Sequence, residues 1–158
     1  MHSYSARVAW SGSTGAGYDG YDRRHGGISS AGFSVALSSD VGFKGDPACL
    51  NPEELLVMAA ASCQLLAFLA VAARARLDVV EYRDEALGLM PETALTKITL
   101  RPHIVIVSSP ERPADEARVR HLCEVAHREC YIANSLLTAV QVEPTVTIST
   151  EGATKQAP

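Results

Sequence analysis

Residues Leu55 to Ala73 read LLVMAAASCQLLAFLAVAA, a run of 19 residues without a charged side chain. A run of this length reaches the span of a membrane-crossing helix. Against that interpretation, the polar triplet Ser62–Gln64 lies at its centre, alanine is abundant, and the acidic pair Glu53–Glu54 adjoins one end. A helix that is apolar on every side is otherwise buried on every side. We therefore expect a central helix of a soluble protein, covered by two sheets or by a second subunit.

The residues before this run form a strong helix start. Asn51 is a suitable N-cap, Pro52 suits the first helical position, and Glu54 completes a capping-box spacing. At the other end, the cations of Arg74–Arg76 are favourable because the helix dipole is negative there. The sequence therefore predicts one long helix over about residues 51–76.

The flanking sequence predicts strands and a second helix. Pro102 is expected at a bulge or a sheet edge, and the last eight residues, EGATKQAP, are expected to fray. The resulting order is typical of an α+β protein and not of a doubly wound parallel sheet. We expect one domain, with an N-terminal β part over 1–48 and a C-terminal α/β part over 77–150. The expected strands cover residues 6–10, 32–38, 79–89, 95–107 and 139–148, and the second helix covers about 114–130, with a break and a short helix after it.

Composition limits the classes of function. The chain has 158 residues, of which 47% are hydrophobic, so one domain with a sizeable core is expected and global disorder is excluded. The net charge is −4 and no basic stripe stands out, which gives no support to a nucleic-acid interface. Four cysteines are too few for a disulfide scaffold. The opening MHSYSARVAW lacks the apolar segment of a secretory signal, so a cytoplasmic protein with reduced thiols is expected.

The stretch Gly15–Gly20, GAGYDG, matches the G-x-G-x-x-G spacing of dinucleotide-binding loops. That motif requires a helix directly behind it, whose N-terminus holds the pyrophosphate. The residues that follow, YDRRHGG, have no apolar period. We therefore interpret residues 12–27, which hold six of the eleven glycines, as a plain loop.

The role of Cys63 has two possible interpretations. It fits a small apolar residue in a buried helix. A cysteine in the middle of a helix gains nothing from the helix dipole, so a reactive Cys63 needs a cation from elsewhere to stabilise its thiolate. Arg23 and Arg24, next to His25 in the glycine-rich loop, are the candidates for that cation.

The second expected helix carries its own thiols. Cys123, His127 and Cys130 fall within about 60° of arc on a helix. With Cys63 as a fourth ligand they form a candidate metal cluster, although the spacing fits no standard zinc template. The alternative is that Cys123 and Cys130 belong to the apolar stripe of this helix.

Two segments resemble a known family. NPEELLVMAAASC, residues Asn51–Cys63, and AHRECYIANSL, residues Ala126–Leu136, resemble the OsmC/Ohr family. In that family an Asn-Pro-Glu motif precedes a first cysteine by the same interval, and a second cysteine lies about this far downstream. The resemblance covers most of residues 20–150, and the Tyr21–His25 stretch is closer to the OsmC-like branches. It implies an α+β fold of two antiparallel sheets around central buried helices, in an intertwined homodimer.

The resemblance also implies an activity, the thiol-dependent reduction of organic hydroperoxides. Carried over residue by residue, Cys63 matches the peroxidatic cysteine and Cys130 the resolving cysteine. Glu53 matches a carboxylate that pairs with an arginine, and Arg23 is the best match for that arginine. The family uses no resident cofactor or metal, and its reductants are external dithiols, lipoyl groups among them.

Other residues are assigned around these. Arg24 and Gln64 are expected to contact the substrate, whereas Cys49 and Cys123 are expected only to pack. Tyr131 follows Cys130 where many relatives have proline. No membrane or nucleic-acid partner is expected.

Glu53 raises a geometric question. It lies ten residues before Cys63, roughly 15 Å of rise along one helix, so it does not reach an arginine beside its own Cys63. Either the helix begins later than Asn51, or Glu53 serves the site of the other subunit in a symmetric dimer.

A second hypothesis comes from another class of protein. It is a non-enzymatic homodimer of the same fold that binds a small apolar ligand, or a metal through cysteine and histidine. Thiol behaviour separates the two, because only a peroxidase consumes peroxide and two thiols together.

Overall fold

A computed structural model of the chain describes residues 1–150. The chain divides into two compact units, residues 1–56 and residues 57 onward, and the boundary lies within helix α1 (Pro52–Arg74). The segment EGATKQAP, which we expected to fray, lies outside the described residues.

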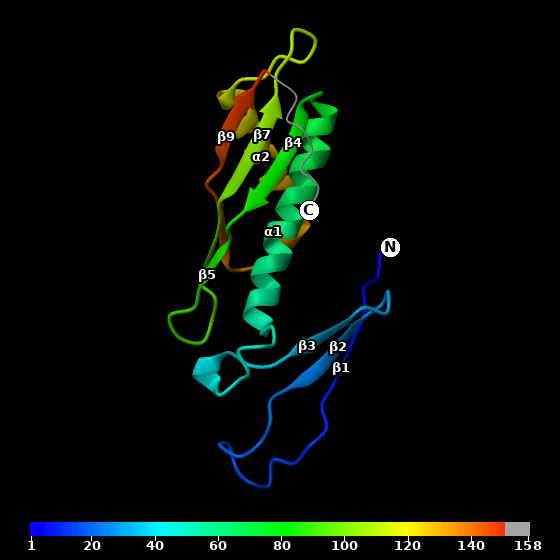
Figure 1. The fold of residues 1–158 in the computed structure, drawn as a ribbon, viewed down its shortest axis with the longest axis vertical. Helices are drawn as coiled ribbons and strands as arrows, with labels where there is room; N and C mark the ends of the chain where they lie inside the picture. The colour runs from blue at the N-terminus through cyan, green and yellow to red at the C-terminus, as the bar shows by residue number, and fades with distance from the viewer. Residues whose placement is uncertain (151–158) are drawn as a thin grey trace. The chain divides into compact units, whose positions relative to one another are not determined.

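The first unit contains one antiparallel sheet. Its order is β1-β2-β3, with β1 at Ala6–Ala9, β2 at His25–Ser29 and β3 at Ser34–Leu37 (Figure 1). The loop between β1 and β2 runs into a strand and not into a helix, as expected for a glycine-rich stretch without nucleotide-binding context. Strand β2 corrects our prediction, which placed its first residues in that loop. Its two glycines weaken the strand signal, because glycine contributes no side chain to a sheet face. A short 3₁₀ turn, η1 (Val41–Phe43), follows β3.

Helix α1 begins as predicted. The Glu54 amide donates to Asn51 Oδ1 at 2.8 Å, and the Asn51 amide donates to Glu54 Oε2 at 3.1 Å. This is a capping box, and Pro52 is the first helical residue. The helix therefore does not begin late, and that explanation of Glu53 is removed.

In length and composition alone, α1 also passes the test for a membrane span, as do the core helices of many soluble proteins. Its buried residues are Ala60, Gln64, Phe68, Val71 and Ala72.

The second unit contains two three-stranded sheets, β4-β7-β9 and β5-β6-β8. The β4–β7 and β5–β6 pairs are antiparallel, whereas β7–β9 and β6–β8 are parallel. The α+β class is as predicted, but residues 1–150 form three sheets, two of them mixed, where we expected two antiparallel ones. The strands are β4 (Asp78–Asp84), β5 (Leu87–Leu89), β6 (Lys97–Leu100), β7 (Pro102–Val107), β8 (Ala139–Val142) and β9 (Thr145–Ser149).

Each of our three expected strands in this unit is thus two strands in different sheets. Pro102 marks one division and is the first residue of β7, where its missing N–H costs the sheet little. Pro144 lies at another, between β8 and β9. Runs of apolar residues alone did not reveal these breaks.

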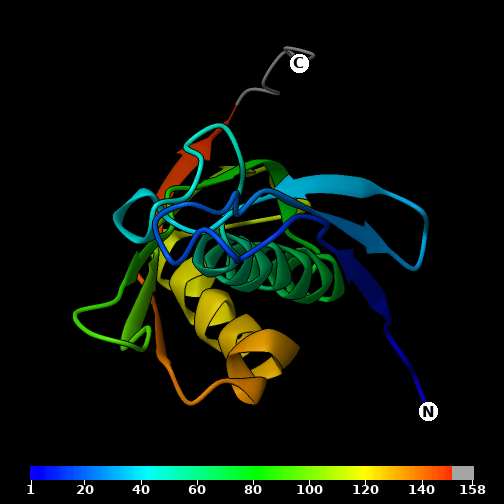
Figure 2. The ribbon, with the colours of Figure 1, turned by 90° about the horizontal axis from the view of Figure 1, so that it is seen from below.

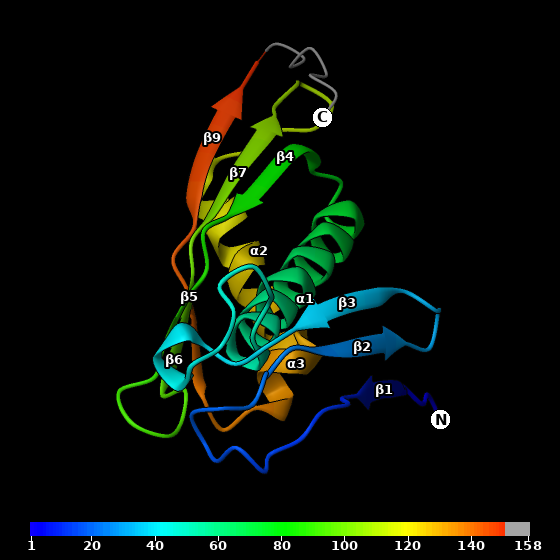
Figure 3. The same ribbon diagram turned by 60° about the horizontal axis from the view of Figure 1, so that its bottom comes forward.

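The core of this unit forms between the helices and the sheet β4-β7-β9. Helix α2 (Glu116–Glu129) starts at Asp115, whose Oδ1 accepts from the Arg118 amide at 2.8 Å. Helix α3 (Tyr131–Ser135) continues from it beside α1, as Figures 2 and 3 show. Strand β7 alternates buried and half-buried residues, which is the pattern of a strand with one face on a core. The core cluster is Phe68, Val71, Ala72, Leu77, Ile104, Ile106, Val119, Cys123 and Ala126.

Candidate functional site

Two cysteines that are far apart in the sequence lie together in the second unit. Cys63 is in the middle of α1, and Cys130 is the residue between α2 and α3. The Cys63 thiol lies close enough to Cys130 to raise the pKa of that residue. The backbone amide of Ile132 also donates to Cys63 Sγ at 3.4 Å. All four cysteines of the chain are free thiols in this structure.

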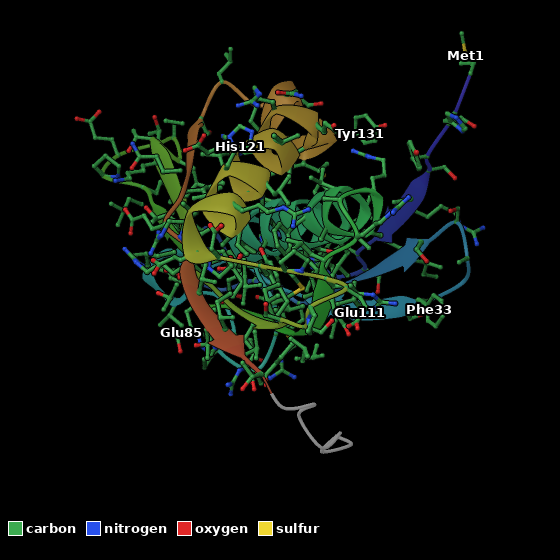
Figure 4. The ribbon with its side chains drawn as sticks, turned by 90° about the horizontal axis from the view of Figure 1, so that it is seen from above. Met1, Phe33, Glu85, Glu111, His121 and Tyr131 are labelled. Atoms are coloured by element: carbon green, nitrogen blue, oxygen red, sulfur yellow. The ribbon has the colours of Figure 1, made fainter. Side chains whose placement is uncertain are left out.

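A break between two helices places Cys130. It ends α2 and begins α3 with an extended backbone, φ −73° and ψ 108°. Its carbonyl accepts from the Asn134 amide at 3.0 Å, which starts α3 immediately. The next residue, Tyr131, is 83% exposed on α3 and is labelled in Figure 4. The break therefore presents the thiol to α1 while the neighbouring ring faces solvent.

The two thiols have different environments. Burial is the largest cause that raises the pKa of Cys130 to about 11; the adjacent Cys63 acts in the same direction, and the Ala133 and Ile132 amides act against it. Cys130 is 1% exposed, whereas Cys63 is half-buried. At neutral pH Cys130 is therefore a neutral thiol, and Cys63 is the sulfur that a solute reaches first.

Gln64 lies in the interface between α1 and α2. Its side chain is buried, and Nε2 donates to the carbonyl oxygen of Cys123 at 3.3 Å. Within residues 1–150, Oε1 has no hydrogen-bond partner. The structure thus places this amide in a helix contact beside Cys63, and its expected role in substrate binding stays a prediction.

The four candidate metal ligands do not lie together as one group in residues 1–150. No group of three or more His, Cys, Asp or Glu residues in the described part of the chain could hold a metal ion. Cys123 instead belongs to the core, where burial raises its thiol pKa to about 12. Cys123 thus packs as the apolar-stripe alternative expects, whereas Cys130 lies at the break after α2.

The first unit holds a cavity of about 570 Å³ that combines aromatic and charged walls. Arg23 and Glu53 both line it. No salt bridge within residues 1–150 joins Glu53 to a cation. The other lining residues are Val8, Trp10, Thr14, Tyr18, Tyr21, His25, Ser38, Ser39, Asp40, Phe43 and Pro52.

The two adjacent arginines have different surroundings. Arg24 forms an ion pair with Asp46, and its amide donates to Asp22 Oδ1 at 2.9 Å. Arg23 instead turns its guanidinium into the cavity wall, while its carbonyl accepts from His25 Nδ1 at 2.9 Å. Of the two cations that the sequence offered, Arg23 is the one at the cavity.

Two parts of these sites were not identified from the sequence. The Ile132 amide is a backbone group, which no residue pattern identifies. Tyr18 and Tyr21 contact Arg23 from the same loop, and their closeness in sequence to the arginine was the available signal.

The fold and the thiol pair define a class: an α+β protein in which a central helix and the start of a later helix bring two free cysteines into contact. The family model for OsmC-like proteins matches residues 44–145, and the chain belongs to this family. No curated protein sequence matches the chain.

Solved structures agree with this assignment. An OsmC-like protein of unknown function from Vibrio cholerae is 31% identical, with a TM-score of 0.82 over 92% of this chain and 100% of that one. Two more distant neighbours share the fold. The organic hydroperoxide resistance protein OsmC from Legionella pneumophila is 18% identical, with a TM-score of 0.65 over 93% of this chain and 98% of that one. An organic hydroperoxide resistance protein from Elizabethkingia anophelis with bound thiocyanate is 19% identical, with a TM-score of 0.64 over 94% and 98%.

Proposed function

We propose that this protein reduces organic hydroperoxides to alcohols with Cys63 and Cys130 as its redox pair. The observation that carries the proposal is the closeness of these thiols, which are 67 positions apart in the sequence: Cys63 lies near enough to raise the pKa of Cys130, and the Ile132 amide, two residues after Cys130, donates to Cys63 Sγ at 3.4 Å. The names of the Legionella and Elizabethkingia neighbours support the same chemistry.

In the first step the Cys63 thiolate attacks the distal oxygen of the peroxide. The O–O bond breaks and the alkoxide leaves, takes up a proton and becomes the alcohol, while Cys63 becomes a sulfenic acid. The Ile132 amide donates to the Cys63 sulfur and so helps to hold it in place. The more exposed thiol of the pair is thus the one that reacts with the peroxide.

In the second step Cys130 attacks the oxidised sulfur. An S–S bond forms, the S–O bond breaks, and the hydroxyl leaves as water after it takes the Cys130 proton. An external dithiol then reduces the disulfide and is itself oxidised, so the net reaction turns one hydroperoxide and one dithiol into alcohol, water and a disulfide. Lipoyl groups are among the dithiols that the family resemblance offers.

Arg23 and Glu53 complete the proposed site as charged groups. The guanidinium stabilises the thiolate and donates to the peroxide oxygens, and the carboxylate orients it. Glu53 and Cys63 are ten residues apart on the single helix α1, which is about 15 Å of rise. This separation favours an arrangement in which Glu53 acts beside the Cys63 of a second copy of the chain.

A homodimer also explains why one face of α1 exposes apolar side chains. Met58, Leu66 and Leu69 are 54%, 64% and 39% exposed, and Ser62 and Ala73 continue the same stripe at helical spacing. In the proposed dimer a second copy of the chain covers this stripe. Four free thiols suit a reducing compartment, so we place the protein in the cytoplasm.

Thiol counting with stoichiometric cumene hydroperoxide tests the function. The reduced protein is expected to lose two thiols per equivalent, and peptide mapping is expected to find a Cys63–Cys130 disulfide. Cys130→Ser is expected to stop at a Cys63 sulfenic acid, which a dimedone adduct at that residue detects. Hydrogen peroxide is expected to react more slowly, because its small polar body gains little from an apolar surround.

Cys49→Ser is the matched control, since this half-buried thiol lies outside the redox pair. It is expected to keep the parent rate. If Cys63→Ser consumes peroxide at the rate of the parent protein, the proposed function is wrong, and the non-enzymatic ligand-binding hypothesis takes its place.

A further inference from the structure

The Arg23 guanidinium lies against two tyrosine rings of its own loop. Its Cζ atom is 4.1 Å from the centroid of the Tyr21 ring and 4.7 Å from that of Tyr18. Its Nη1 donates to the Tyr21 carbonyl at 3.0 Å, and Nη2 donates to the Tyr18 carbonyl at 2.6 Å. Each tyrosine therefore holds the arginine twice, with its ring and with its backbone.

A second layer of aromatic contacts supports these rings. Tyr21 meets both Tyr18 and Trp10 edge-on, with centroid distances of 6.4 Å and 6.2 Å. Trp10 is fixed in turn, because its indole Nε1 donates to the Asp22 carbonyl at 2.8 Å. Lys44, which pairs with Asp19, lies 5.9 Å from the Tyr18 ring. The rings thus form a connected group and not isolated side chains.

The glycines of this loop make the arrangement possible. Gly17 has a φ of +80°, a conformation that other residues adopt with strain. A Cβ on Gly20 would lie 2.6 Å from the Ala16 Cβ and 2.8 Å from the Ala16 carbonyl oxygen. The Gly20 amide donates to the Gly17 carbonyl at 3.1 Å, which closes the turn between them. The G-x-G-x-x-G spacing, which serves no dinucleotide here, therefore shapes the turn that carries both tyrosines.

The contacts restrict a side chain that is otherwise among the most flexible. An unrestrained arginine samples many rotamers, and fixing one of them carries an entropic penalty. Stacking a guanidinium on aromatic rings offsets that penalty. A guanidinium has five N–H donors, and the two carbonyl bonds use two of them. The others remain for a ligand in the cavity that Arg23 lines.

We propose that Tyr18 and Tyr21 are positioning residues that hold the Arg23 guanidinium in its productive orientation. This inference rests on the proposed function, in which Arg23 acts on the thiolate and the peroxide. Neither tyrosine touches the reacting atoms in this scheme. Both act only through the arginine.

Leucine and phenylalanine substitutions test the role of the rings in the full-length reduced protein. Tyr21→Leu removes the aromatic face and is expected to lower kcat/KM for cumene hydroperoxide by about tenfold. Tyr21→Phe keeps that face and the backbone carbonyl, so it is expected to stay within about twofold of the parent. The same pair at Tyr18, whose ring is 60% exposed, carries the test if Tyr21→Leu does not fold. Equal losses in the leucine and phenylalanine variants would overturn the inference.

A double-mutant cycle separates positioning from a general structural effect. If the rings act only through Arg23, Tyr21→Leu is expected to change the rate of Arg23→Ala by less than about twofold. A Tyr21→Leu loss that persists in full without the arginine overturns the inference and leaves the proposed function intact. An Arg23→Ala protein that reacts at the parent rate removes the arginine from both, and activity in Cys63→Ser removes the proposed function as a whole.

Fluorescence gives a readout that does not depend on activity. Trp10 is the single tryptophan of the chain and lies against Tyr21. Its emission is expected to shift in Tyr21→Leu and to stay at the parent wavelength in Tyr21→Phe. An unchanged emission in Tyr21→Leu shows that the ring group does not depend on Tyr21, and this contradicts the inference.

Discussion

The two units of this protein differ in how they are held together. Residues 57–150 contain nearly all of the buried apolar side chains, whereas Leu37 is the one buried apolar residue in 1–56. The first unit has one three-stranded sheet and exposes many large apolar side chains, most of them in the segments around that sheet, an arrangement that is marginal by itself. The exposed residues are Met1, Tyr4, Val8, Trp10, Tyr18, Phe33, Val41 and Phe43.

The two units also differ in which proposed catalytic groups they carry and in how they hold them. Cys63 lies on α1 and Cys130 at the end of α2, and both helices pack into a core, so the contacts that stabilise the unit also fix the spacing of the thiols. Arg23 and Glu53 line a cavity in the unit with almost no core, where local contacts orient the charged groups. One region thus fixes positions by packing, and the other by hydrogen bonds and ring contacts.

A pair of phenylalanine substitutions, one in each unit, is expected to show the largest difference in stability. Phe68→Ala removes a fully buried ring and is expected to lower the free energy of unfolding by about 3–5 kcal/mol. Phe33→Ala removes a ring that is 79% exposed, labelled in Figure 4, and is expected to change it by less than about 0.5 kcal/mol. Urea unfolding measures both. Similar losses would mean that the first unit has a core after all.

A charge in the exposed stripe of α1 is expected to have the next largest effect, on self-association. Leu66→Asp places a charge where the proposed dimer is apolar, and it is expected to weaken self-association at least 100-fold, about 2.7 kcal/mol. Analytical ultracentrifugation measures this. Leu89→Asp on β5, whose parent side chain is 48% exposed, is the matched control and should leave association unchanged. A parent protein that sediments as a monomer removes the dimer and our explanation of Glu53.

The buried thiol predicts a pH dependence. Because the pKa of Cys130 is raised to about 11, its neutral form dominates below that pH, and its thiolate fraction grows about tenfold per pH unit. The rate of disulfide closure after peroxide addition is therefore expected to rise about tenfold from pH 7 to pH 8. Acid quenching followed by mass spectrometry measures closure, and a pH-independent rate would show that Cys130 is activated during the reaction.

Two matched helix caps give the smallest expected effect. Asp115→Ala removes the cap of α2 and is expected to cost about 1 kcal/mol of unfolding free energy. Asn51→Ala removes the same kind of contact from α1, but its first turn lies in the unit with little core, so local fraying is expected to reduce the loss to about half that. Equal losses would indicate that the two units unfold as one.

Local patterns in the sequence predicted the local structure well. The capping box at Asn51 and Glu54 involves neighbours, and the helix behind it began where they indicated. Strand β2 and the division of the long strands depend instead on which segments pair, and that information is spread over distant parts of the chain. Of the residues in the candidate metal cluster, Cys123 packs in the hydrophobic core, a role that its spacing from His127 and Cys130 did not indicate.

The site divides in the same way. The contact between Cys63 and Cys130 was expected from family resemblance, since spacing alone relates no residue to another 67 positions away. Tyr18 and Tyr21 are close to Arg23 in the sequence. Their contact with it was still not predicted, because the stacking of an arginine on a ring requires no fixed sequence spacing.

The hydrogen bond from Gln64 to the Cys123 carbonyl has a consequence for the register of the two helices. An amide in an apolar interface finds its acceptor at one relative position of the helices, and a slide of one turn, about 5.4 Å, would leave it unpaired. A polar group of this kind selects one alignment among several that apolar packing alone would tolerate. The Gln64 hydrogen bond thus also helps to set the distance between the Cys63 and Cys130 sulfur atoms.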